Sequence, residues 1–266
     1  MKKNVFIFCA AITSLSLTTF GFINWSNTET LQEVVPKIKT VSLTNDTTNT
    51  INKKVDIDLV YDVDSRFIAT ITKENLNKAT SVLDIVPKKA KGWWKTSFHT
   101  VTISILQEGA EIQETGNNKT LNASQIKLLK TTDYSTNFYI KARGYDIHAE
   151  TGRIEDYAYY FTIIPEKEAA YISGHNTLIS YLKENSKDKT VIIKKDKLKS
   201  GKVSFTVTKK GLVSNVKLIS TSGYPTIDEV LLELITKIPG KWKPAENHKG
   251  EKIDQELIFS FGRMGC

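Results

Sequence analysis

Apolar and polar residues alternate most regularly in the last hundred residues of the chain, between positions 168 and 261. In residues 203–208 the apolar positions recur every second residue, which is the period of a strand with one buried face. Apolar residues resume at 213–218, and the intervening Lys-Lys-Gly sequence at 209–211 supplies a glycine that accepts positive φ. This pattern predicts a β-hairpin.

A helix and a closing strand are expected after the hairpin. Residues 222–225, Ser-Gly-Tyr-Pro, interrupt the chain, and Thr226 and Glu229 then have the spacing of a capping box. The apolar face of the predicted helix consists of Ile227, Val230, Leu231, Leu234, Ile235 and Ile238. Pro239 and Gly240 end this helix. The apolar residues of the closing strand are Ile253, Leu257, Phe259 and Phe261.

Residues 55–166 predict a separate, β-rich middle domain. Thr72 is expected to cap a helix that continues through Leu83, and Asn122 is expected to begin a shorter helix. Alternation predicts strands at 55–61, 67–71, 98–106, 138–142 and 157–163. The last of these strands carries apolar residues on both faces, so we expect both of its faces to be covered.

The N-terminal segment predicts export from the cytoplasm. Lys2 and Lys3 precede an uncharged, largely apolar stretch of about twenty residues that ends near Trp25. Residues 1–25 fit two alternatives, a cleaved secretory signal and an uncleaved membrane anchor. Residues 26–54 are rich in Thr, Asn and Ser with little apolar periodicity, and they predict a flexible linker.

Four motifs in the C-terminal region resemble the TonB C-terminal domain. They are the Gly-x-Val that opens a strand at 201–203, the Lys-Gly-x-Val turn at 210–213, the Ser-Gly at 222–223 before a helix that contains Asp228, and Trp-x-Pro-Ala at 242–245. The resemblance covers about residues 168–262 and implies a small βαββαβ domain at 167–266. Three features differ from the family: Lys-Asp-Lys-Thr at 187–190 replaces a Tyr-Pro, Ile-Asp at 227–228 replaces a Leu-Asp in the second helix, and no Pro-rich spacer precedes the domain.

The middle region is similar to the C-terminal domain of GldM, a periplasmic component of Bacteroidetes gliding and secretion machinery. The similarity rests on the strand at 101–106, the Glu-Thr-Gly at 114–116, the helix onset with Leu121, Gln125 and Leu129, and the Ile-x-Ala strand at 140–142. It implies an immunoglobulin-like β module. The expected fold class is therefore α+β, with an immunoglobulin-like middle domain at 55–166 followed by the TonB-like domain.

Composition and charge limit the classes of partner. The 266 residues suffice for two domains, each with its own core. The net charge of +8 comes mostly from lysine, and nine lysines lie between 187 and 210. Because readers of nucleic acid usually combine arginine with interleaved aromatics, we expect a solvated surface here and no nucleic-acid partner. Cys9 and Cys266 imply no disulfide framework within the chain.

The sequence contains no constellation typical of an enzyme. No phosphate-binding loop, nucleophile elbow or paired-carboxylate motif occurs, so we expect no catalytic residue and no cofactor. The cysteines, histidines and carboxylates lack the spacing of a metal site. Trp242 is expected to be a core residue. For the pair at 93–94 an exposed aromatic platform is the alternative to anchoring at the domain edge.

The resemblance to TonB implies that the last strand of the domain is an edge that captures an extended segment of an outer-membrane receptor. Main-chain hydrogen bonds of an edge strand can do this without any particular side chain. The implied partner-binding residues are Lys252, Ile253, Asp254, Gln255, Glu256, Leu257, Ile258 and Phe259.

Two functions remain open. The first is a TonB-like energy transducer in the periplasm or cell envelope, which couples to a proton-motive complex of the inner membrane and needs residues 1–25 as an anchor. The second is a soluble, exported interaction module that uses the same fold without transducing energy. Its partner would be an envelope protein or, in a homodimer, a second copy of the chain.

Overall fold

The computed structural model describes residues 59–67, 69–90, 92–107, 109–146, 153–194 and 196–263. The chain divides into two units, Met1–Lys53 and Lys54–Cys266, and every described residue belongs to the second. The segment 1–25, expected to be a signal or an anchor, and nearly all of the linker 26–54 belong to the first unit, and both lie outside the described residues. No helix within the described ranges is long and apolar enough to cross a membrane.

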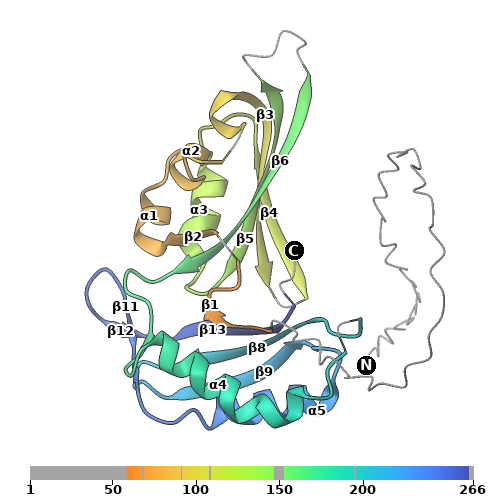
Figure 1. The fold of residues 1–266 in the computed structure, drawn as a ribbon. Coiled ribbons are helices and arrows are strands. Elements are labelled where there is room, and N and C mark those ends of the chain that lie inside the picture. Colours follow the sequence, from red (N-terminus) through yellow and green to blue (C-terminus); the bar gives the residue numbers. More distant parts are fainter. Residues whose placement is uncertain are drawn as a thin grey trace, which may run out of the picture. The chain divides into compact units, whose positions relative to one another are not determined.

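The C-terminal part of the chain forms a four-stranded antiparallel sheet (Figure 1). Its strands are, in order, β1 (Val60–Asp64), β13 (Gln255–Gly262), β8 (Ser200–Val207) and β9 (Val213–Ser220). Helices α4 (His175–Thr190) and α5 (Pro225–Thr236) cover one face of this sheet. Their buried leucines and isoleucines pack against Phe205, Phe259 and Phe261 and form one core.

Four two-residue strands extend this part of the fold. β7 (Ala170–Tyr171) pairs with β10 (Trp242–Lys243), and β11 (Ala245–Glu246) pairs with β12 (Lys252–Ile253). The chain therefore contains the expected first helix, hairpin, second helix and closing strand in the expected order. The short strands β10, β11 and β12 and the addition of β1 to the sheet are features that the sequence analysis did not predict.

The middle region forms a five-stranded sheet with its own core. The strands are, in order, β2 (Ala69–Thr72), β6 (Ile154–Ile164), β5 (Asn137–Asp146), β3 (Thr96–Gln107) and β4 (Ala110–Gly116), and only the pairing of β2 with β6 is parallel. One face is covered by α1 (Lys73–Lys78), α2 (Val82–Ile85), α3 (Ala123–Thr131) and the 3-10 turn η1 (Trp93–Lys95) (Figure 1).

The α+β class is confirmed, whereas the immunoglobulin-like form of the middle domain is not. Across the described residues this region contains one sheet, and helices supply the apolar cover that a second sheet provides in a sandwich. The buried apolar residues that these helices contribute to the cover include Leu76, Val82 and Leu129. The strand β6 is not covered on both sides along its length, since Tyr160 on the other face is 48% exposed.

Capping residues determine where the helices begin. Thr72 caps α1 as expected, and Asn122 forms a capping box with Gln125 at the start of α3. The single helix expected through Leu83 is instead divided into α1 and α2, because Ser81 starts a new capping box. The helix α5 begins at Pro225, one residue before the expected cap Thr226, since proline suits the first helical position.

The aromatic residues expected to be structural have that role. Trp242 is 6% exposed and packs against Phe205 and Tyr171. In the tryptophan pair only the second ring is exposed, because Trp93 is buried and Trp94 is 39% exposed. The pair therefore anchors the start of β3 rather than forming a platform of two exposed rings.

Gln125 is expected to stabilise the middle domain by satisfying two main-chain groups. Its Oε1 accepts from Asn122 N–H (3.0 Å), and its Nε2 donates to the carbonyl of Val101 (2.9 Å) within the core. Gln125→Ala should lower the free energy of unfolding by about 2 kcal/mol because both groups lose their partner. Urea denaturation measures the change, and Gln113→Ala at an exposed position of β4 is the matched control. Equal effects of the two substitutions would contradict the assigned role.

Candidate functional site

The strand β13 lies between two others in the C-terminal sheet. On one side all eight of its residues pair with β8, from Gln255 opposite Val207 to Gly262 opposite Ser200. On the other side β1 covers five residues, with Val60 opposite Gly262 and Asp64 opposite Ile258 (Figure 1). The expectation that the last strand is an edge is therefore wrong for residues 258–262.

The eight residues expected to bind a partner have three different positions. Ile258 and Phe259 are buried and paired with β1. Gln255 and Leu257 point into the domain, where the amide of Gln255 accepts from Ala169 N–H (2.7 Å) and donates to Glu168 (2.9 Å). The other four residues, which are Lys252, Ile253, Asp254 and Glu256, line a groove.

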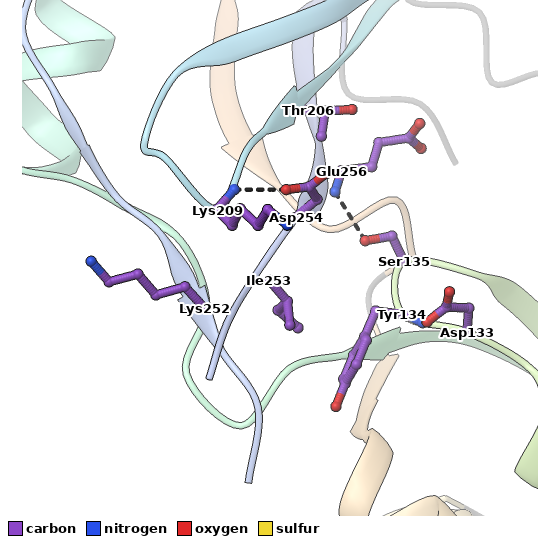
Figure 2. A pocket seen from close by; sticks show the side chains of 9 residues that line it. All are labelled: Asp133, Tyr134, Ser135, Thr206, Lys209, Lys252, Ile253, Asp254 and Glu256. Carbon is purple, nitrogen blue, oxygen red and sulfur yellow. Dashed lines mark hydrogen bonds between the residues drawn. The ribbon is translucent and has the colours of Figure 1, made fainter. Parts of the chain in front are cut away.

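This groove, which we call the β13 groove, lies beside the first three residues of β13, 255–257, which β1 does not reach (Figure 2). It has a volume of about 520 Å³. Its opposite wall is the loop 133–135 of the middle domain, from which Tyr134 and Ser135 line the space. Both charge signs are present in the lining, with lysines at 209 and 252 and carboxylates at 133, 254 and 256.

A side chain, not a strand, satisfies the main chain of β13 inside the groove. Glu256 N–H donates to Ser135 Oγ (2.9 Å), as the dashed line in Figure 2 marks. Ser135 has a φ of 60°, the left-handed region that non-glycine residues rarely adopt. Asp254 Oδ1 accepts from Lys209 N–H (2.6 Å), so this carboxylate holds the hairpin turn against β13. The hydroxyl of Ser135 thus takes the place that a neighbouring strand has at Ile258.

The strand β1 is fixed to β13 chiefly by Tyr61. The ring of Tyr61 lies 5.1 Å from that of Phe261 and 6.1 Å from that of Phe259, measured between centroids. A hydrogen bond of 2.7 Å joins its hydroxyl to Ser186 Oγ on α4, and Lys183 Nζ lies 5.7 Å from the ring centroid. The exposed Asp62 lies 3.3 Å from His175, at the start of the same helix.

The other edge of the sheet, β9, is irregular. Its register with β8 shifts twice, and Asn215 within it has a φ of 52°. Bulges of this kind twist an edge strand away from further pairing. Leu218 and Ile219 are more than two-fifths exposed on this strand. The regular edge of the sheet is consequently the opposite one, where β1 and the β13 groove lie.

Sequence reasoning located the strand β13 but missed Tyr61 and Ser135. The alternation of Leu59 and Tyr61 did predict a strand, but it was assigned to the middle domain. The structure places that strand in the C-terminal sheet. Nothing in the local sequence marks Ser135 as a partner of Glu256. Within the described ranges no group of three or more metal-binding side chains occurs.

Comparison with known proteins assigns part of this region to a family. Residues 200–262 match the family model of the Gram-negative bacterial TonB protein C-terminal region. The match covers β8, β9, α5 and β13 and confirms the resemblance of the C-terminal region, whereas β1 and α4 lie outside it. Searches of curated proteins and of solved structures found no match.

The family is one of non-enzymatic interaction domains, which generally contact outer-membrane proteins and belong to cell-envelope proteins. The match therefore suggests a TonB-like periplasmic protein that takes part in interactions within the envelope. It identifies no particular partner.

The attachment of β1 is expected to weaken at alkaline pH. Burial raises the pKa of Tyr61 above that of an exposed tyrosine, although its hydrogen bond with Ser186 lowers it in part. A pKa that is higher in the attached strand means that attachment has its full strength below the pKa of the free tyrosine, about 10, and loses strength as pH rises.

A difference titration tests this expectation. Phenolate absorbance of the wild-type chain and of Tyr61→Phe should differ by one tyrosine that ionises later than the exposed ones. Tyr160→Phe, at an exposed position, is the control. The expectation is wrong if the tyrosine missing from Tyr61→Phe titrates together with the exposed tyrosines.

Proposed function

We propose that this chain is a TonB-like envelope protein whose β13 edge binds an extended segment of an outer-membrane receptor by strand addition. The observation that carries the proposal is the antiparallel pairing of β13 with β1, an extended strand from a distant part of the chain. The edge therefore has the regular main-chain geometry that an added strand requires. The family match at residues 200–262 supports the same class of partner.

The β13 groove is the entry point for such a segment. It borders the part of β13 that β1 leaves uncovered, and there one hydroxyl, that of Ser135, occupies the amide of Glu256. An incoming carbonyl replaces this hydroxyl at little cost, since one hydrogen bond is exchanged for another. Lysines and carboxylates around the groove favour a polar, charged segment over an apolar one.

A more specific version of this proposal is that the chain also transduces energy. In this form residues 1–25 anchor the chain in the inner membrane near a proton-motive complex, and residues 26–54 form a linker. The middle domain, from β2 to β6, then takes the place of the Pro-rich spacer that the sequence lacks. The C-terminal domain, residues 167–266, carries the binding edge.

The second candidate is a soluble, exported interaction module without energy transduction. Two observations favour it: Pro36 is the sole proline before Pro87 in the sequence, and the edge is covered at residues 258–262. The intact mass of the native protein and its distribution between membrane and soluble fractions distinguish the two candidates. A mass that includes residues 1–25, found in the inner membrane, supports the transducer. Loss of that segment with release to the soluble fraction supports the module.

Site-specific crosslinking tests the partner. A photoreactive residue in place of Ile253, which lines the groove, should crosslink in intact cells to an outer-membrane receptor. The crosslinked site on the receptor should lie in an extended segment that faces the periplasm. The same residue in place of the exposed Glu184 on α4 is the control. Equal crosslinking from both positions, or none to any outer-membrane protein, would contradict the proposal.

Two substitutions with opposite expected effects test the main-chain contact. Glu256→Pro removes the amide that faces the groove, and crosslinking to the receptor should fall about tenfold because proline cannot donate this hydrogen bond. Ser135→Gly removes the competing hydroxyl and suits the positive φ at this position, so crosslinking should increase. Circular dichroism confirms that both chains fold. If both substitutions reduce crosslinking equally, the amide of Glu256 is not the contact.

A further inference from the structure

The strand β1 is shorter than the edge that it covers. It pairs with five residues of β13, whereas β8 pairs with eight. Positions 255–257 of β13 have no partner in β1, and the β13 groove begins there. The edge therefore has space for a strand that is longer than β1.

The side chains of β1 alternate between the core and the outside. Tyr61, opposite Phe261, and Val63, opposite Phe259, face the core, and both belong to or pack against it. Asp62 and Asp64 face outward and are exposed. Because side chains alternate along any added strand, this edge has inward-facing positions that take an aromatic and a β-branched side chain.

The next inward-facing position along the edge is nearly vacant. Continuing the register by one residue places Ser65 opposite Leu257. Its short side chain donates to Glu168 (3.3 Å) and leaves a pocket of about 300 Å³. We call this the Trp242 pocket, and its main apolar lining is Val63, Tyr171, Leu178, Trp242 and Leu257.

The side chain of Trp242 forms part of the wall of this pocket. Its indole Nε1 is buried and has no hydrogen-bond partner among the described residues. A buried donor without an acceptor is costly, and few occur in native proteins. Because this donor is closed off from solvent, a side chain in the pocket contacts Trp242 by packing and not by a hydrogen bond.

We propose that β1 occupies the place of the partner's strand, and that the partner is an extended segment with an aromatic, a β-branched and a third, larger side chain at alternate positions. The third side chain fills the Trp242 pocket. Acidic residues at the intervening, outward-facing positions match those of β1, of which Asp62 lies 3.3 Å from His175. This inference rests on the proposed function and adds to it the kind of segment that binds.

Binding then requires exchange of one strand for another. As part of the same chain, β1 has an effective concentration on the order of millimolar, so it outcompetes a free segment unless that segment makes more contacts. The Trp242 pocket and the amide of Glu256 are contacts that β1 leaves unused. A longer segment gains the packing of the pocket and exchanges the hydrogen bond of Ser135 for its own at the amide of Glu256, so the pocket is the physical reason for displacement.

Synthetic peptides with the sequence of residues 59–66 test the inference by fluorescence anisotropy. On the full-length chain with Tyr61→Ala, the unmodified peptide should bind at least about tenfold more tightly than on the wild-type chain, because two ring contacts no longer hold β1. A peptide with Ser65→Gln should bind more tightly still, because the longer glutamine side chain fills the pocket. A peptide with Tyr61→Ser should bind at least about tenfold more weakly. Equal binding of the three peptides overturns the inference.

A locked chain provides the second test. Asp62 and Ser260 lie directly opposite each other, at a separation that a disulfide can span. In a chain with Asp62→Cys, Ser260→Cys, Cys9→Ser and Cys266→Ser, oxidation should abolish peptide binding and reduction should restore it. Unchanged binding by the oxidised chain overturns the inference. Covalent dimers linked through positions 62 and 260 also overturn it, because β1 would then be exchanged between two copies.

Failure of this inference differs from failure of the proposed function. If the peptides do not distinguish the chains while position 253 still crosslinks to a receptor, the edge binds its partner by another pattern, and the inference is wrong. If the peptides bind as expected but no receptor is crosslinked, the description of the edge holds and the receptor is the wrong partner.

Discussion

The C-terminal sheet depends on the pairing of β1 with β13. Residues 60–64 precede the middle domain in the chain, and residues 255–262 follow it, yet the two strands form one regular antiparallel pair. Tyr61 belongs to the core side of that pair, where its ring contacts Phe259 and Phe261. The middle domain is consequently inserted between the first strand of the C-terminal sheet and the remainder of it.

The sequence predicted correctly those features that depend on contacts between neighbouring residues. The cap of α1 at Thr72 and the capping box of Asn122 with Gln125 involve neighbouring residues, so both were visible before the structure. The same limited range explains the errors. Tyr61 does belong to a strand, as the alternation of Leu59 and Tyr61 predicts, but this strand pairs with β13, which is far away in the chain.

The candidate site was only half predictable because its two sides come from distant parts of the chain. Alternation and family resemblance identified β13, but the period of a strand gives no information about which strand lies next to it. Neither Tyr61 nor Ser135 is near β13 in sequence. Tyr61 pairs with Phe261 of β13, and the hydroxyl of Ser135 accepts a hydrogen bond from Glu256 N–H. For the middle domain the sequence did not determine what covers the sheet, since an apolar sheet face is covered equally well by helices or by another sheet.

The two edges of the C-terminal sheet are protected from further strand pairing in different ways. The difference has a mechanical consequence. The edge at β9 is protected by bulges, which are part of the folded strand itself. The edge at β13 is protected by hydrogen bonds to β1, a separate strand that can dissociate from it. Residue 59 leads directly into β1, so tension applied through the preceding chain acts on the β1–β13 pair and on the side chains of β1 that pack in the core. Tension on that side therefore favours exposure of β13. In a transducer, the pull from the inner membrane and the opening of the binding edge are then the same event.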